Sequence, residues 1–331
     1  MTFGSLFAGI GGFDLGLERA GLCGIWQVEN DQHCLEVLTA RWPQVDRWPD
    51  ILNMNPADFE CPDVICFGSP CQDLSVAGKH AGLDGERSGL FHEAVRVIRA
   101  FVSRGLRFAL WENVPGAFSS RGGRDFAAVL RALAQCGAVD IAWRVLDCRW
   151  LSLAQRRQRV FLVADFRAER AAEILSLAES LSGHPAPRRQ ARQEVAGTIS
   201  GSSPSRRGAG SCPGHLIAGT IQAGQLVATL APGGHPGGIT GREAELGSLV
   251  VTHALRTQER LVRRLTPLEY ERLMGFPEDW TKIKTQKGKP MSDSARYRML
   301  GNAVCPPVAE YIGKRLLVAF VKQAEKTAQG S

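Results

Sequence analysis

Apolar residues in the first half of the chain form short continuous runs that alternate with stretches of helical spacing. Short runs bounded by glycine, proline or polar residues are typical of buried strands, and apolar residues three or four positions apart are typical of helices. The pattern predicts strands beginning at Ser5 and Gly24, and further strands at residues 64–67, 108–111, 138–146 and 160–164. It predicts helices at residues 13–21, 89–103 and 126–133. Such alternation of strands and helices is typical of an α/β fold.

The pattern changes at about Arg167. Helical spacing continues from Ala168 to about Leu181, and glycine, serine, proline and arginine then dominate. Three similar segments at residues 196–199, 218–221 and 228–230 are irregularly spaced, which argues against a solenoid repeat. They favour short β segments joined by glycine-rich loops, with a disordered linker as the alternative. A final helix is expected from Val308 to about residue 323, after two prolines.

The composition is typical of a globular protein without a membrane span. The 331 residues are 44% apolar, which fits one large globular domain or two of ordinary size. The net charge of +7 favours an anionic partner, although many soluble proteins carry a basic surface. The nine cysteines form no Cys-x-x-Cys pair, so no metal site is expected, and free thiols suggest a reducing cytoplasm. We expect no signal peptide and no membrane span.

Residues that can carry chemistry stand where predicted strands end. Cys71 lies in the segment Gly68-Ser69-Pro70-Cys71-Gln72, directly after the strand at residues 64–67. Ligands of open α/β sheets bind at this edge, where Cys71 is a candidate nucleophile or one more small buried residue. Glu112 follows another apolar strand and is a candidate acid or a solvated carboxylate. The basic cluster Gln155–Arg159 is either an anion or base-edge contact or a solvated turn.

A glycine turn, Phe7–Gly12, joins the first strand to the first helix and can approach a ligand closely. A dinucleotide fingerprint needs glycine at position 14, where Asp14 stands, so a nicotinamide cofactor is disfavoured while a nucleoside-type ligand is not. Glu29, at the end of the second strand, is either a ribose ligand or a solvated carboxylate. Asp50 is equally a contact for an adenine amino group or a turn residue.

Six motifs in order make the chain resemble the cytosine-5 DNA methyltransferase family. Each motif is weak alone, but the ordered set is very specific and covers about residues 3–320 except the middle. The proline at position 49 departs from the glycine that the family often has before the residue equivalent to Asp50. The six motifs are Phe7–Gly12, Pro70–Gln72, Glu112–Val114, Gln155–Phe161, Arg264–Pro277 and Gly301–Val304.

The resemblance implies a doubly wound S-adenosylmethionine-dependent methyltransferase domain with a small β-rich target-recognition domain inserted. The implied parts are a catalytic domain at residues 1–166, the target-recognition domain at 167–263, and a C-terminal part at 264–331 whose last helix returns to the catalytic domain. The implied partner is double-stranded DNA, bound by a cytoplasmic monomer. A restriction-modification or phage DNA-protection setting follows, in which a restriction endonuclease acts separately.

The resemblance also implies roles for individual residues. Cys71 would attack carbon 6 of a flipped cytosine, and Glu112 would protonate its ring nitrogen 3. Arg157 and Arg159 would hold the base edge or its phosphate and favour the thiolate. The implied S-adenosylmethionine contacts are Phe7, Ala8, Gly9, Ile10, Gly11, Gly12, Glu29, Asn30, Asp50, Ile51, Pro70, Leu90, Asn302 and Ala303. The DNA contacts are expected among Arg188, Arg206, Arg207, Arg256 and Arg260.

Other classes of protein remain to be weighed. A zinc deaminase also acts on a flipped base, but its Pro-Cys-x-x-Cys signature fails here because Leu74 replaces the second cysteine. An RNA methyltransferase could use the same Cys71 and Glu112, although the long basic insert favours DNA. A DNA-binding regulator with an inactive catalytic domain is disfavoured because both of these residues are intact.

Overall fold

The structure is a computed structural model that describes residues 1–69, 89–176, 249–253 and 260–329. Its centre is a seven-stranded sheet with the order β3-β2-β1-β4-β5-β7-β6. Neighbouring strands are parallel except for β7, which runs antiparallel to both β5 and β6. The strands are β1 (Thr2–Leu6), β2 (Cys23–Val28), β3 (Asp46–Trp48), β4 (Val64–Phe67), β5 (Phe108–Asn113), β6 (Asp140–Asp147) and β7 (Gln158–Asp165).

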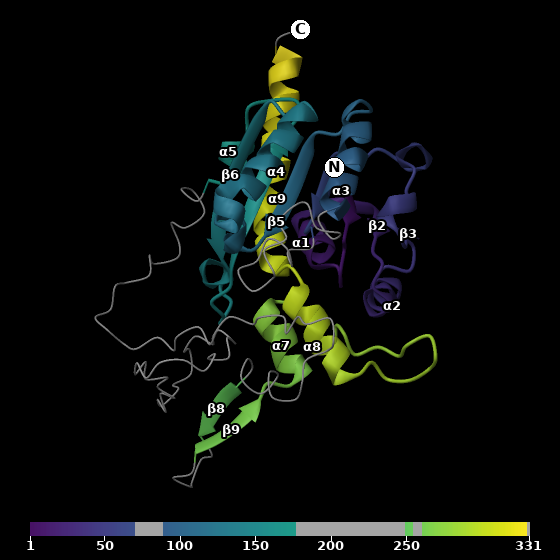
Figure 1. Ribbon diagram of the computed structural model, residues 1–331, viewed down its shortest axis with the longest axis vertical. Coiled ribbons are helices and arrows are strands. Elements are labelled where there is room, and N and C mark those ends of the chain that lie inside the picture. Colours follow the sequence, from purple (N-terminus) through teal and green to yellow (C-terminus); the bar gives the residue numbers. More distant parts are fainter. Residues whose placement is uncertain (70–88, 177–248, 254–259, 330–331) are drawn as a thin grey trace, which may run out of the picture.

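Side chains of each central strand alternate between two apolar cores, because successive residues of a strand point to opposite faces. In β4, Val64 and Cys66 belong to one core, whereas Ile65 and Phe67 belong to the other. Helices α1 (Gly12–Ala20), α2 (Gln32–Arg41) and α9 (Pro306–Gln329) contribute to the first core. Helices α3 (Gly89–Val102) and α4 (Arg124–Gln135) contribute to the second. Helices on both faces of the sheet confirm the predicted doubly wound fold (Figure 1).

The last helix of the chain lies against the first. A Cβ atom on Gly16 would stand 2.4 Å from the carbonyl oxygen of Pro306, and one on Gly313 would stand 2.7 Å from the Cβ of Ala20. The two glycines therefore allow α1 and α9 to approach closely. Residues near the two ends of the chain build one domain as a result (Figure 1).

The predicted helix from Ala168 to about Leu181 is wrong in extent within the described residues. Only α5 (Ala171–Ile174) is helical there. Side chains of α9 bind the carbonyl groups that a longer helix would use, because Arg315 donates to Glu173 and Ile174 and the Tyr311 hydroxyl donates to Ser176. Helical spacing alone could not show this competition.

The remaining described residues form a smaller region after β7 and α5. Strands β8 (Leu249–His253) and β9 (Arg260–Arg264) pair antiparallel, and α7 (Pro267–Met274) and α8 (Asp293–Asn302) follow. A capping box of Thr266 and Glu269 begins α7, and Gly275 ends it in the left-handed conformation. In Figure 1, α7 and α8 lie between the β8–β9 pair and the large sheet. The similar segments at residues 196–199, 218–221 and 228–230 lie outside the described residues.

Short 3-10 turns connect several of these elements. They are η1 (Ile51–Asn53), η2 (Pro56–Asp58), η4 (Pro115–Phe118), η5 (Ser120–Gly123) and η6 (Cys148–Leu151). Among the helices that the structure describes, none is long and apolar enough to cross a membrane.

Candidate active site

The glycine turn Phe7–Gly12 leaves β1 and enters α1. Phe7, Gly9 and Gly11 all have positive φ angles, of 54°, 58° and 78°, which glycine adopts most easily. Gly11 and Gly12 are packed tightly, because a Cβ atom would lie 2.3 Å from the Trp42 ring and 2.3 Å from the Val304 carbonyl oxygen, respectively. A Cβ atom on Gly9 would meet no described atom within 4 Å. The turn is therefore tightly supported at one end and open to a ligand at Gly9.

Glu29 ties the end of β2 to this turn. Its Oε2 atom accepts a hydrogen bond of 2.7 Å from the backbone N–H of Gly9. Its Oε1 atom accepts bonds of 2.9 and 2.8 Å from the N–H groups of Asn30 and Asp31. Burial raises the pKa of Glu29, and these hydrogen bonds oppose that shift. A carboxylate has about four acceptor sites, so one remains for a ribose hydroxyl.

The other predicted cofactor residues lie in several elements and differ in exposure. Asn30 and Asn302 are exposed, while Leu90 is half-buried at the start of α3. Asp50 accepts bonds from the Leu52 backbone N–H and the Asn53 side chain, so it caps η1, and its contact with adenine stays a prediction. Buried positions are taken by Ala8, Ile10, Ile51 and Ala303, whereas Pro70 lies outside the described residues.

The arrangement of the turn fits a nucleoside-type cofactor. An accessible backbone at Gly9 stands next to the buried carboxylate of Glu29, and the two are joined by a short hydrogen bond. A ligand at this place can be bound through its hydroxyl groups and held against the glycine backbone. S-adenosylmethionine, which carries a ribose, has the groups that such a site can bind.

Glu112 is the best-placed acid of the site. It lies in β5 and pairs with Arg159 of β7, whose Nε atom is 3.1 Å from Glu112 Oε1. Only 12% of the Glu112 side chain is exposed. Burial raises the pKa of Glu112, while Arg159 and Arg157 oppose the shift. Glu112 can therefore hold a proton more readily than a surface glutamate, and Arg159 fixes its orientation.

The end of β4 lies beside this carboxyl group. A Cβ atom on Gly68 would stand 3.3 Å from Glu112 Oε2, so glycine leaves space for the acid. Cys71 lies outside the described residues, three positions beyond Gly68. Its role as nucleophile stays a prediction.

Ser69 is a functional candidate that sequence reasoning did not assign. The indole Nε1 of Trp111 donates a 3.0 Å hydrogen bond to Ser69 Oγ, and the Asn113 amide donates one of 3.5 Å. These bonds fix the chain where it leaves β4. The only sequence signal was the position of Ser69 between Gly68 and Pro70, two residues before Cys71.

Arg157 is buried and joins two of the motifs. Its NH2 group donates bonds of 3.0 and 2.9 Å to the carbonyl oxygens of Gly301 and Ala303. Arg157 thus holds the segment that packs on Gly12, and it contributes positive charge near Glu112. The expected contact of Arg157 with the base edge or a phosphate stays a prediction.

The residues predicted to read DNA fall mostly outside the described part of the chain. This holds for Arg188, Arg206, Arg207 and Arg256. Arg260 begins β9, of which the backbone path is described. Their roles stay predictions. Within the described residues there is no group of three or more histidine, cysteine, aspartate or glutamate side chains that could hold a metal ion.

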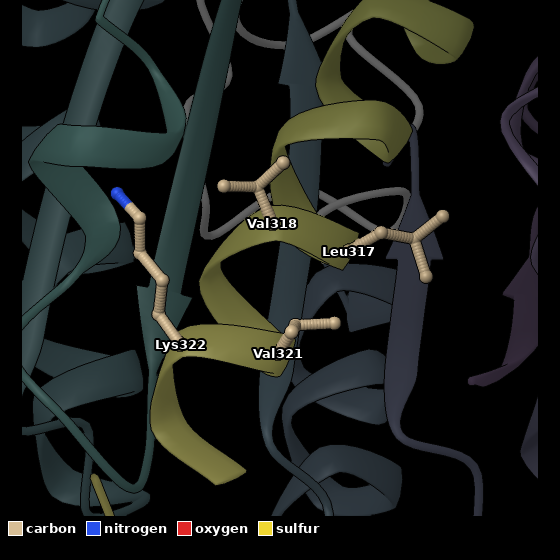
Figure 2. A pocket seen from close by; sticks show the side chains of 4 residues that line it. All are labelled: Leu317, Val318, Val321 and Lys322. Atoms are coloured by element: carbon tan, nitrogen blue, oxygen red, sulfur yellow. The ribbon is translucent and has the colours of Figure 1, made fainter. Parts of the chain in front are cut away.

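A pocket on α9 is separate from this site. Leu317, Val318, Val321 and Lys322 line it, as Figure 2 shows. Leu317 is near Gly21, at the C-terminal end of α1, whereas the glycine turn is at the N-terminal end of that helix. The pocket therefore lies away from the glycine turn.

Comparison with known proteins decides the family. The profile of the family "C-5 cytosine-specific DNA methylase" matches residues 1–211 and 217–318. The chain belongs to this family. This membership confirms the resemblance seen in the six motifs, the enzyme class of DNA cytosine-5 methyltransferases, and S-adenosylmethionine as the methyl donor.

Curated relatives cover most of this methyltransferase chain. It is 32% identical to the Type II methyltransferase M2.BsuMI of Bacillus subtilis, over 94% of the chain and 74% of the relative. It is 27% identical to a protein of Escherichia phage P1 named DNA N-6-adenine-methyltransferase, over 98% of the chain. The chain spans 62% of the length of that phage relative.

Solved structures agree with the fold. S. pombe Dnmt2 methyltransferase has a TM-score of 0.66 and 17% identity, and the similarity covers 97% of this chain and 99% of that one. A putative DNA modification methyltransferase encoded within a prophage (E. coli) has a TM-score of 0.61 and 18% identity, over 96% and 98% of the two chains. At this identity the two structures support the methyltransferase fold alone.

Proposed function

We propose that this protein methylates carbon 5 of a flipped cytosine in duplex DNA through a covalent adduct with Cys71. The observation that carries the proposal is the place of Glu112. This buried acid is paired with Arg159 and stands beside Gly68, at the end of the strand that leads to Cys71. A nucleophile and an acid on opposite sides of one small ring are what the reaction needs.

Covalent addition solves the main chemical difficulty, because carbon 5 of cytosine is a poor nucleophile. The Cys71 thiolate forms a bond to carbon 6, and the electron pair of the ring moves toward nitrogen 3. Glu112 gives its proton to nitrogen 3 as this happens. The resulting adduct is electron-rich at carbon 5 and can accept a methyl group there. Loss of the carbon 5 proton to solvent then releases Cys71, and the nitrogen 3 proton returns to Glu112.

The charges around Glu112 suit this cycle. Its raised pKa favours the protonated form that nitrogen 3 requires, while Arg159 stabilises the carboxylate left after proton transfer. S-adenosylmethionine, when bound, supplies an electrophilic methyl group. On the side of the chain, Glu29 and the open backbone of Gly9 would hold its nucleoside part.

The target cytosine must leave the base stack, since a stacked base cannot be reached by Cys71 and Glu112 together. We assign the choice of DNA sequence to residues 185–263, which include the arginines expected to contact DNA. The name of the Bacillus subtilis relative, a Type II methyltransferase, supports a restriction-modification setting. A separate restriction endonuclease is a further part of the proposal. Action as a monomer is part of the same proposal.

A second target base has one observation in its favour, because the phage P1 relative is named an adenine N-6 methyltransferase. The match to the cytosine-specific family and the Pro70-Cys71-Gln72 motif favour cytosine. Methylation of an exocyclic amino group requires no attack on the ring, so a cysteine nucleophile would have no purpose there. RNA remains the alternative polymer, because the same pair of residues could act on it.

The test is transfer of isotope-labelled methyl groups to long duplex DNA of mixed sequence, followed by digestion to nucleosides. We expect the label in 5-methylcytosine and its loss in the Cys71→Ser variant. Label in N6-methyladenine would overturn the choice of base, and a higher rate on RNA of the same sequence would overturn the choice of polymer. Full activity of Cys71→Ser would overturn the covalent route.

A further inference from the structure

The C-terminal part of the chain reaches the glycine turn through Trp280. The indole Nε1 of Trp280 donates a 3.0 Å hydrogen bond to the backbone carbonyl oxygen of Ile10. Both residues are buried, with 7% of Trp280 and 1% of Ile10 exposed. This bond joins residues 270 positions apart, and it ends on the middle of the turn rather than on its flanking strand or helix.

Aromatic and cationic groups hold the Trp280 ring in place. Its centroid lies 5.5 Å from that of Trp42 and 5.6 Å from that of Phe276. The guanidinium carbon of Arg41 lies 4.8 Å from the ring centroid of Trp280. Arg41 also donates hydrogen bonds to the carbonyl oxygens of Asp279 and Trp280. The indole therefore has little freedom to turn away from Ile10.

The backbone on the other side of Trp280 is fixed as well. Glu271 Oε1 accepts hydrogen bonds from the backbone N–H and the hydroxyl group of Thr281, and it pairs with Arg296 at 3.1 Å. Arg296 in turn donates to the Thr281 hydroxyl. Thr281 and Glu271 are fully buried, so this network anchors the segment that presents Trp280.

A rigid N–H donor bound to the carbonyl oxygen of Ile10 can order the glycine turn before a ligand binds. The turn contains three glycines, and a glycine backbone loses more freedom than any other when it is ordered. Ordering the turn in advance means that a bound ligand need not supply that free energy itself. The hydrogen bond from Trp280 ends on Ile10, and at the preceding residue, Gly9, a Cβ atom would meet no described atom within 4 Å.

We propose that Trp280 is a positioning residue for the methyl donor, because its hydrogen bond to Ile10 holds the glycine turn in the conformation that binds S-adenosylmethionine. This inference rests on the proposed function only in that the turn binds this cofactor. Trp280 acts through the backbone of the turn and does not touch the reacting atoms.

The test is the variant Trp280→Phe, which keeps an aromatic ring but removes the N–H donor. Its affinity for S-adenosylhomocysteine, the product form of the cofactor, can be measured by calorimetry on the full chain. A neutral hydrogen bond contributes about 0.5–1.5 kcal/mol, which corresponds to an affinity lower by roughly two- to tenfold. The KM for S-adenosylmethionine should rise by the same factor, with kcat and the KM for DNA close to wild type.

The chain offers a matched control in Trp26. Its indole Nε1 also donates a 3.0 Å hydrogen bond to a backbone carbonyl oxygen, that of Glu60, and the residue is 2% exposed. Trp26→Phe removes the same kind of bond away from the glycine turn. Both variants should lower the thermal midpoint, but Trp26→Phe should bind S-adenosylhomocysteine as the wild type does.

The outcomes separate this inference from the proposed function. A wild-type protein that binds no S-adenosylhomocysteine would refute the cofactor assignment itself. If the wild type binds and Trp280→Phe binds equally well, the positioning role is wrong and Trp280 only stabilises the fold. Should Trp280→Phe fail to fold, Arg41→Ala provides the second variant, since it loosens the carbonyl groups and the ring of Trp280. Unchanged affinity in Arg41→Ala would then overturn the inference.

Discussion

At the scale of single residues, Asp14 disfavours a nicotinamide cofactor by its identity and has a raised pKa because of its surroundings. In the sequence, it occupies the place of the third glycine of a dinucleotide fingerprint. In the structure, Asp14 is buried in α1, with 1% of the residue exposed. It accepts hydrogen bonds of 3.1 Å from Ser5 Oγ and 2.8 Å from Gln27 Nε2. Burial raises the pKa of Asp14 from 3.8 to about 6, although these hydrogen bonds oppose the shift.

This raised pKa makes stability depend on pH with a definite sign. The native state holds the Asp14 proton more tightly than the unfolded chain does. The contribution of that proton to stability is fully present below pH 3.8 and is lost as the pH rises through about 6. At neutral pH the buried charge costs up to about 3 kcal/mol, since one unit of pKa corresponds to about 1.4 kcal/mol.

We therefore expect Asp14→Asn, which keeps the shape without the charge, to be more stable than wild type at neutral pH. The difference in the free energy of unfolding should be largest above about pH 7 and should shrink as the pH falls toward about 4. Urea unfolding of the two proteins across this range measures it. A constant difference at all pH values, or a less stable variant at neutral pH, would contradict the account of Asp14.

The residues of the site were predictable to the extent that they stand at strand ends. Glu29 and Glu112 follow apolar runs, so their place at one sheet edge could be inferred from the sequence. The partners that orient them could not. Arg157 stands in a basic cluster, yet it is buried against the carbonyl groups of Gly301 and Ala303. Only the packing of the C-terminal part on the glycine turn explains this.

At the scale of elements, the close approach of α1 and α9 is the contact that joins the two ends of the chain. Glycine normally weakens a helix by about 1 kcal/mol relative to alanine, so Gly313 within α9 needs a reason. The reason is space. A Cβ atom there would stand 2.7 Å from the Cβ of Ala20 and 3.1 Å from Leu17 Cδ2.

We predict that Gly313→Ala destabilises the protein even though alanine favours helices. Overpacking a tight contact typically costs about 1–3 kcal/mol, which exceeds the gain in helix propensity of about 1 kcal/mol. The midpoint of thermal unfolding measures the result. Gly89→Ala, at the start of α3, is the control, because a Cβ atom there meets no described atom within 4 Å and should be neutral or stabilising. A Gly313→Ala variant more stable than the wild type would show that the helices can move apart at little cost.

Most helices and strands were predictable because the apolar residues that form their sequence patterns are the ones buried in the two cores. The strands at residues 64–67 and 108–111 appear as continuous apolar runs because both faces of a central strand are buried. The predicted helix at residues 168–181 is wrong in extent within the described residues, because contacts distant in sequence determine where it ends. Its described part is short because Arg315 and Tyr311, far away in sequence, bind its carbonyl groups.

At the scale of the whole molecule, residues near the two ends of the chain are held together by contacts that the local sequence pattern does not predict. Gly12 packs on Val304, Ile10 accepts from Trp280, and Gly16 packs on Pro306. All three contacts bring the C-terminal part onto the glycine turn or the helix that follows it. None of these contacts involves residues 185–263, which we expect to vary without altering the chemistry of the site.

This organisation predicts that sequence choice can be exchanged as a unit. We expect a hybrid that carries the equivalent of residues 185–263 from a Type II methyltransferase of different specificity to methylate the site of that relative. Bisulfite sequencing of DNA from cells that express the hybrid identifies the methylated context. The full-length parent proteins serve as controls. A hybrid that remains active on the original site would place sequence choice elsewhere in the chain.

The covalent role of Cys71 is the central claim, and one measurement tests it most directly. Duplex DNA amplified with 5-fluorodeoxycytidine triphosphate is incubated with the protein and S-adenosylmethionine, and the protein is then denatured and digested for mass spectrometry. Release of the cysteine requires carbon 5 to lose a proton. Fluorine in the place of that hydrogen cannot leave as a cation, so an adduct that has accepted the methyl group cannot release its cysteine.

We predict a stable protein–DNA adduct attached at Cys71. It should be absent in Cys71→Ser and should form roughly 100-fold or more slowly in Glu112→Gln. Attachment at another residue, or methyl transfer by the wild type to ordinary DNA without any adduct on the fluorinated duplex, would contradict the account.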